Sequence, residues 1–338
     1  MEISGYRIDI ESAAEALKKQ RCKTIAMQIP EGLKRSAFPL VDFLKQQTGA
    51  TVIVSADPCF GACDVINYEM KHLNVDVVVH IGHTPIAGVE NFCIPTLFLN
   101  AQSTLDVTKV VERAIHSLEG KKIGLVTTAQ HLHVLDTVAA LLKKHGLDVF
   151  ITEGDERISA QGQILGCNFS AGVRIAKQVD CFLFIGSGMF HPVGLLMSTQ
   201  KPVIAADPYT IAVKKQEIEE MKNKILRQRY SAIHASSNAR RFGILIGIKR
   251  GQQRIQLAYE LEKMITSAGR QSLLVAQDEF SPVSLQGFAL DCYVSTACPR
   301  IAIDDFLQYK KPILTPVELE IALGKRKWEA YVFDEILG

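Results

Sequence analysis

Three stretches decide the fold of this chain: KTIAMQIPEGL (residues 23–33), KKIGLVTTAQHLH (121–133) and RRFGILIGIKRGQ (240–252). Each begins with one or two basic residues, continues as an apolar run and ends in a polar turn. Apolar runs of this length are typical of strands that are buried on both faces of a parallel sheet. The recurrence of one layout predicts three copies of a single structural unit.

Each opening leads into further elements in a fixed order. A helical pattern that ends at a glycine comes first, then a second strand, a third strand that follows a VD or LD dipeptide, and a fourth strand. The helical patterns cover 38–49, 134–146 and 255–269, the third strands 75–83, 179–188 and 290–298, and the fourth strands 94–100, 201–209 and 311–316. This alternation predicts parallel sheets with helices on both faces.

The sequence therefore predicts an α/β fold of three related domains, at residues 1–105, 106–210 and 211–338, arranged around a common centre. Three ordinary sheets that resemble one another only because all such sheets look alike are the alternative. The element order and the VD dipeptide recur together, which favours true triplication.

Composition narrows the class of protein. The 338 residues are 47% hydrophobic and 22% charged, with 38 basic and 36 acidic residues and a formal charge of +2. A dedicated nucleic-acid binder would carry a larger basic excess, so we expect no direct nucleic-acid binding. No apolar run reaches the length of a membrane span, and the first residues do not resemble a signal peptide, so we expect a cytoplasmic protein. In that reducing compartment the eight cysteines suggest metal binding or catalysis rather than disulfides.

Two cysteines occupy equivalent places in the first two units. Cys63 lies 13 residues before Asp76, and Cys167 lies 13 residues before Asp180. Both follow the second strand of their unit and come just after a small residue, in GACD and LGCN.

The third unit places its cysteine differently. Cys298 lies seven residues after Asp291, at the end of the third strand, where the other units carry His83 and Ser187. Ligands of open parallel sheets bind beyond the carboxyl ends of the strands, and all three cysteines lie at such ends.

If the units meet at a common centre, three thiolates could hold a 4Fe–4S cluster with one iron free of protein ligands. Zinc with three cysteines is the rival metal, and buried core residues are the plainer alternative. Cys181 and Cys292 lie inside apolar strands and are predicted to be core. Cys59, in DPCFGAC, is a candidate fourth or substitute ligand.

Several long motifs resemble one family. They are GACD (61–64), TTAQHLH (127–133), GQILGCNFS (162–170), FIGSGMFHPVG (184–194), ACPRIAIDD (297–305) and KPILTPVE (311–318). In order, and over nearly the whole chain, they resemble the archaeal diphthamide biosynthesis enzymes, the 2-(3-amino-3-carboxypropyl)histidine synthases. The compact CxxxCxxC motif of most radical S-adenosylmethionine enzymes is absent from the sequence.

The resemblance implies a homodimer of three-domain subunits with a 4Fe–4S cluster on Cys63, Cys167 and Cys298. It implies that the reduced cluster cleaves S-adenosylmethionine at the bond from sulfur to the methionine γ-carbon. The resulting 3-amino-3-carboxypropyl radical would add to imidazole C2 of a histidine on translation elongation factor 2, the first step of diphthamide biosynthesis. The electron donor stays unknown, and Cys59 is not expected to be a required cysteine in this family.

Strand ends supply candidates for binding S-adenosylmethionine. By position alone we expect this role for Gln130, Gly186, Ser187, Gly188, His191 and Arg300. An ion pair of Arg300 with Asp304 or Asp305 is the structural alternative for that arginine.

Rival functions remain open at this point. The predicted arrangement also resembles quinolinate synthase, which has a three-fold repeat of small α/β domains with three cysteines on one cluster. That enzyme acts without S-adenosylmethionine. A non-catalytic protein with three domains around a small ligand is a rival of another class. A zinc hydrolase is the weakest alternative, because the sequence shows neither HExxH nor a second pair of histidine ligands.

Overall fold

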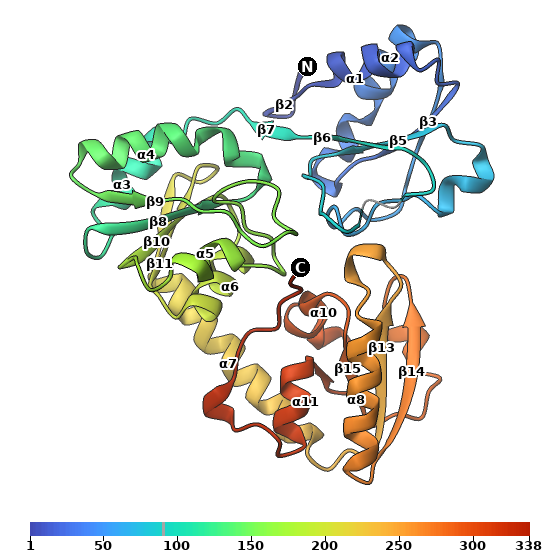
Figure 1. The fold of residues 1–338 in the computed structure, drawn as a ribbon, viewed down its shortest axis with the longest axis vertical. Coiled ribbons are helices and arrows are strands. Elements are labelled where there is room, and N and C mark those ends of the chain that lie inside the picture. The colour runs from blue at the N-terminus through green and yellow to red at the C-terminus, as the bar shows by residue number, and fades with distance from the viewer. Residues whose placement is uncertain (90–91) are drawn as a thin grey trace.

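Three parallel sheets, one for each predicted repeat, form the framework of the molecule (Figure 1). The computed structural model describes residues 1–89 and 92–338. Within these ranges every parallel sheet pairs its strands in the order second, first, third, fourth. The identical order in three sheets confirms the predicted α/β fold of three related units.

The first unit contains β3 (Thr24–Gln28), β4 (Thr51–Val54), β5 (Val77–Ile81) and β6 (Thr96–Leu99). The second contains β8 (Lys122–Thr127), β9 (Asp148–Phe150), β10 (Cys181–Ile185), β11 (Val203–Asp207) and an antiparallel edge strand, β12 (Ala212–Lys214). The third contains β13 (Arg241–Gly247), β14 (Gln271–Gln277), β15 (Cys292–Ser295) and β16 (Ile313–Leu314). A small antiparallel sheet of β1 (Glu2–Ile3), β2 (Tyr6–Ile8) and β7 (Ala101–Ser103) stands apart from these.

The helix after the first strand recurs in each unit, as predicted. It is α2 (Ala37–Thr48), α4 (Leu135–Lys144) or α8 (Ile255–Ser267). The glycine at or just beyond each helix end has a positive φ: 72° at Gly49, 76° at Gly146 and 70° at Gly269. Glycine adopts this left-handed conformation without the steric cost of a Cβ, which explains why all three helical patterns end on it.

The recurring aspartates have a structural role that accounts for their repetition. Each accepts hydrogen bonds from two backbone N–H groups where the first strand begins. Asp76 accepts from Lys23 and Thr24, at 2.6 and 2.9 Å, and Asp180 and Asp291 do the same in their own units. These backbone donors lower the pKa of all three carboxyl groups. The VD or LD dipeptide thus ties the third strand to the start of the first.

The second crossover of each unit contains less helix than the repeat pattern predicts. It contains only a 3-10 turn at Glu69–Leu73, the six-residue α5 (Ser170–Ile175) or the four-residue α9 (Pro282–Leu285). The remaining helices are α1 (Ile10–Lys19), α3 (Thr108–Ile115), α6 (Phe190–Thr199), α7 (Gln216–Ser236), α10 (Pro299–Ile303) and α11 (Pro316–Ala322). Irregular chain in the second crossovers of the first two units carries Cys63 and Cys167, whereas Cys298 follows the third strand of its unit.

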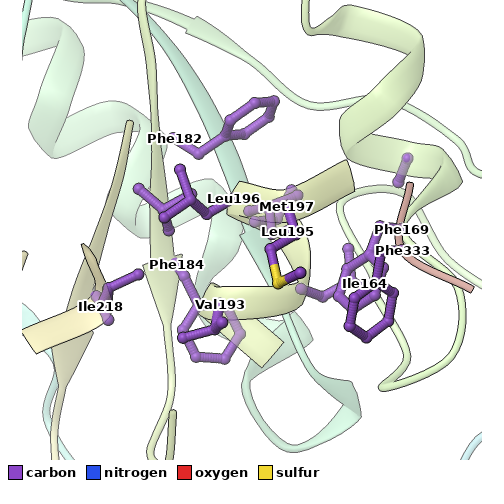
Figure 2. Packing of buried hydrophobic residues seen from close by; sticks show 14 of the residues in the cluster. Ile164, Phe169, Phe182, Phe184, Val193, Leu195, Leu196, Met197, Ile218 and Phe333 are labelled. Carbon is purple, nitrogen blue, oxygen red and sulfur yellow. The ribbon is translucent and has the colours of Figure 1, made fainter. Parts of the chain in front are cut away.

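The C-terminal segment joins the second unit to the third. After α11 the chain turns back, and its end lies among the three units (Figure 1). Figure 2 shows Phe333 beside Phe169 in the apolar core of the second unit, with ring centroids 5.7 Å apart. Cys181 and Cys292 are fully buried in their sheets, as predicted. Among the described residues, no helix combines the length and apolar character needed to cross a bilayer.

Candidate metal centre

The loops that carry Cys63, Cys167 and Cys298 all lie at the carboxyl ends of the parallel strands. Cys63 follows β4, Cys167 follows β9, and Cys298 immediately precedes α10 after β15. The chain reaches each cysteine through irregular backbone, which leaves these loops free to extend toward a neighbouring unit.

The thiols of Cys63, Cys167 and Cys298 influence one another's pKa. Burial raises the pKa of Cys167 well above the ordinary thiol range, and both Cys63 and Cys298 raise it further. Burial, and then Cys63, raise the pKa of Cys298 to about 12. The pKa of Cys63 is also raised, chiefly by burial. Three partly buried cysteines from three units therefore lie within electrostatic range of one another, and their raised pKa values favour the protonated thiols.

Close backbone contacts hold the first and third units together at this point. Gly251 N donates to the carbonyl oxygen of Cys63 at 3.2 Å, and a Cβ at position 251 would lie only 2.4 Å from the Cys63 Cα. Only glycine permits this approach. The Gln252 amide donates to the Cys63 sulfur at 3.4 Å, which counters the effect of burial on its pKa. Lys249 pairs with Asp64 at 2.5 Å across the same boundary.

Arg157 supplies positive charge from the second unit. Its Nη2 donates to the Gly251 carbonyl at 2.9 Å, and its guanidinium lowers the pKa of both Cys63 and Cys167. Its Nε is buried and has no hydrogen-bond partner among residues 1–89 and 92–338. An unpaired buried donor beside two thiols suits an anionic group bound between them.

The C-terminal segment covers the Cys167 loop. Ile336 N donates to the Cys167 carbonyl at 2.7 Å, and Glu335 accepts from Phe169 N at 2.7 Å. Arg254 pairs with Asp334 at 2.7 Å and donates to the carbonyl of Ala297, next to Cys298. The sequence pattern did not predict this contact, because nothing local in the last residues marks them as packing on another unit.

Two of the predicted binding residues flank the thiols. His191 stacks on Phe184, with ring centroids 6.0 Å apart, and a Cβ at Gly166 would lie 3.8 Å from its Nε2. Arg300 lies over the Phe190 ring at 4.6 Å. Burial lowers the pKa of His191 to about 4, so this imidazole is neutral at physiological pH. Arg300 also makes the ion pair with Asp304 considered above, at 2.6 Å, and is half-exposed.

The other predicted binding residues are more dispersed. Gly186 has a φ of 149° and Gly188 of 79°, so backbone shape requires glycine at Gly188. Ser187 between them is exposed. Gln130 donates to the Gly82 carbonyl at 2.9 Å and thus links the second unit to the first. Only His191 and Arg300 of the six have contacts that place them directly beside the cysteine loops.

The sequence did not lead us to predict a pair of histidines, His80 and His83, at the end of β5. His80 and His83 lie beside Cys59. The Cys59 sulfur and one ring nitrogen of each histidine lie within 4.8 Å of one another. Burial lowers the pKa of His80 to about 3 and that of His83 to about 4. The signal was present as HIGH (80–83), an H-x-x-H string at a strand end.

The fold and this site together define a class: α/β proteins of three repeated units whose cysteines converge at the carboxyl ends of their sheets. Residues 29–332 match the family of diphthamide synthesis proteins. The chain is 38% identical to the 2-(3-amino-3-carboxypropyl)histidine synthase of Pyrococcus horikoshii, over 98% of this chain and 94% of that protein. It is 32% identical to the enzyme of the same name from Methanocaldococcus jannaschii, over 95% and 90% of the two chains.

A solved structure agrees. The crystal structure of Dph2 from Pyrococcus horikoshii with a 4Fe–4S cluster is similar with a TM-score of 0.90 and 37% identity, over 98% of this chain and 94% of that one. The chain belongs to the diphthamide synthesis protein family. It is an enzyme of diphthamide biosynthesis, which decides against the quinolinate synthase and non-catalytic alternatives.

Proposed function

We propose that this enzyme transfers the 3-amino-3-carboxypropyl group of S-adenosylmethionine to imidazole C2 of a histidine on translation elongation factor 2. The observation that carries the proposal is that cysteines from three units, at the carboxyl ends of their sheets, lie within electrostatic range of one another. The Pyrococcus protein of the same fold holds a 4Fe–4S cluster, which supports the same cofactor here.

In this proposal Cys63, Cys167 and Cys298 ligate the cluster, one from each of the domains 1–105, 106–210 and 211–338. Three protein ligands on four irons leave one iron for S-adenosylmethionine. The donor set suits such a cluster: the cysteines are partly buried, lie within electrostatic range of one another and are accompanied by the buried Nε of Arg157, which has no hydrogen-bond partner among the described residues. Cluster binding would release the three thiol protons that burial retains in the free protein.

When bound and reduced, the cluster would supply the electron that breaks the bond from the sulfonium to the methionine γ-carbon. The protein's part is positioning, because the choice among three carbon–sulfur bonds depends on how the sulfonium is aimed. Neutral His191 and the aromatic rings around it can line the site without repelling a sulfonium cation. Arg300 on the Phe190 face has free donors for the methionine carboxylate.

We assign Gln130, Gly186, Ser187 and Gly188 to the rim of the same site. Ser187 and Gly188 are exposed and open, which suits the adenosine end rather than the reacting end. We further propose that the working enzyme is a homodimer.

An anaerobic turnover assay tests the proposal. The dithionite-reduced chain is mixed with S-adenosylmethionine and elongation factor 2, and both methylthioadenosine and the mass of the elongation factor are followed. We expect methylthioadenosine together with the mass increase of one 3-amino-3-carboxypropyl group. Release of 5′-deoxyadenosine in place of methylthioadenosine would contradict the proposed bond cleavage. An unmodified elongation factor alongside methylthioadenosine would contradict the proposed acceptor.

A further inference from the structure

A second set of metal-ligating side chains comes wholly from the first unit, and its cysteine lies on the same loop as Cys63, within electrostatic range of that thiol. It consists of Cys59, His80 and His83, whose sulfur and one ring nitrogen from each histidine lie within 4.8 Å of one another. Cys59 is 6% exposed and His80 is fully buried, whereas His83 is partly exposed. The three-unit centre uses none of these residues.

The tautomer of His80 follows from the hydrogen bonds of Gln28. The Gln28 Nε2 donates to the Asp64 carbonyl at 2.7 Å, and its Oε1 accepts from Ile66 N at 3.1 Å. These two backbone contacts fix which end of the amide is the oxygen. The same Oε1 lies 2.7 Å from Nδ1 of His80, so Nδ1 must carry the proton. Nε2 therefore presents a lone pair toward His83.

Backbone shape brings His83 to that lone pair. Side chains three positions apart on a strand point to opposite faces, so β5 must turn between His80 and His83. The turn is at Gly82, whose φ is 92°. It places Nδ1 of His83 3.0 Å from Nε2 of His80. Pro30 packs where a Cβ at position 82 would lie, 2.9 Å from its Cγ, so glycine is required twice over.

The spacing matches a tetrahedral ion. With Zn–N near 2.0–2.1 Å and Zn–S near 2.3 Å, two ligating nitrogens lie about 3.3 Å apart and nitrogen and sulfur about 3.6 Å apart. The observed nitrogen separation of 3.0 Å and the 4.8 Å limit on the trio need only small shifts to reach these values. An Nδ1–H that donates to a carbonyl oxygen, as His80 does to Gln28, is the usual support of a ligating histidine.

We propose that Cys59, His80 and His83 form a site for a zinc-class divalent ion, with a fourth position open to water. One thiolate and two imidazoles suit this borderline-soft metal. On binding, Cys59 loses its thiol proton and His83 moves its proton from Nδ1 to Nε2, so one proton is released for each ion bound. The ion ties the irregular loop that carries Cys63 to the end of β5 and so pre-positions that cysteine.

Cobalt(II) and zinc(II) binding to the full chain test the site. Because the three converging thiols would also bind these ions, the optical titration uses the variant Cys63→Ser/Cys167→Ser/Cys298→Ser. We expect about one cobalt(II) per chain, with a thiolate-to-cobalt charge-transfer band. Adding Cys59→Ser should abolish that band, and adding His83→Gln should weaken cobalt affinity about 10–100-fold. Cys22→Ser, in the same unit, is the matched control and should change neither.

A zinc count on the cluster-loaded chain gives an independent result, should the triple variant fold poorly. After incubation with zinc(II) and gel filtration, wild type should retain about one zinc per chain and Cys59→Ser none, with iron content equal in both. Absence of zinc from wild type, or a cobalt band that survives Cys59→Ser, would overturn the site. Neither result depends on turnover, so the site can fail while the proposed function stands.

Discussion

The two thiol sites of this molecule are built in opposite ways. The proposed cluster site takes one cysteine from each of three units and depends on contacts between them, such as Gly251 against Cys63. The proposed zinc-class site takes Cys59, His80 and His83 from one unit and depends on a single strand and its turn. A triplicated fold can therefore place a site within one unit and a site between units only a few residues apart on one loop. Each can then be broken without the other.

The sharpest way to separate the two sites is at Gly82. Gly82→Ala forces a side chain into a left-handed backbone conformation and toward Pro30, so His83 moves away from His80. We expect unfolding in urea to lose about 1–3 kcal/mol of stability, and cobalt(II) affinity of the first-unit site to fall at least about tenfold. Gly5→Ala is the control, because Gly5 has a φ of 79° but open space around it. Equal losses of cobalt affinity in both variants would contradict the role given to the turn.

Substitution of Arg157 tests the proposed cluster site between the units. Its positive charge should favour the more negative, reduced state of a bound cluster, so Arg157→Gln should lower the reduction potential. A unit charge about 6–12 Å away at an effective dielectric of about 20 is worth about 1.4–2.8 kcal/mol, or about 60–120 mV for one electron. Potentiometric titration followed by electron paramagnetic resonance measures the shift.

The control for that experiment is Arg174→Gln, an exposed arginine of the second unit that donates to the Glu153 carbonyl. It should leave the potential unchanged. Zinc content should stay at the wild-type level in both variants, since neither arginine belongs to the first-unit site. A potential unaffected by Arg157→Gln would remove this residue from the cluster environment.

The smallest expected effect is on thermal stability, from the aspartate that recurs before the third strand of each unit. Two backbone N–H donors lower the folded-state pKa of Asp76, Asp180 and Asp291, so these carboxylates stabilise the fold above their ordinary pKa. That contribution is lost as the pH falls through the lowered folded pKa. Each Asp→Asn variant should lower Tm by about 1–3 °C at pH 7, with the difference from wild type shrinking toward pH 3.

Asp148→Asn, at a strand start of the second unit, is the matched control and should follow the wild-type pH profile. Thermal unfolding followed by circular dichroism gives both curves. A large effect in one unit and none in the others would argue that the three aspartates are not equivalent.

The sequence was most informative about what recurs. Apolar runs, glycine helix ends and the VD dipeptide predicted three parallel sheets, and the hydrogen bonds of Asp76 and its equivalents explain the dipeptide. It was less informative about the crossovers, because their short helices lack a full amphipathic period. It also predicted Cys63, Cys167 and Cys298 as a set: the positions of the first two follow from the repeat, and Cys298 was added because it lies at a strand end of the third unit.

Contacts between distant residues could not be predicted in the same way. The packing of Phe333 against Phe169 joins residues 164 positions apart, and no local pattern encodes it. The His80–His83 pair was missed for a different reason. Strand periodicity places residues three apart on opposite faces, and only the positive φ of Gly82 reverses that expectation. The central question for this chain is which cysteines ligate the cluster.

Iron and acid-labile sulfide per chain after anaerobic purification answer it most directly. The measurement compares wild type with Cys63→Ala, Cys167→Ala, Cys298→Ala and Cys59→Ala. We expect about four irons and four sulfides in wild type, near-complete loss in each of the first three variants, and retention in Cys59→Ala. Iron-free wild type, or a Cys59→Ala variant as depleted as the others, would contradict the division of the cysteines into two sites.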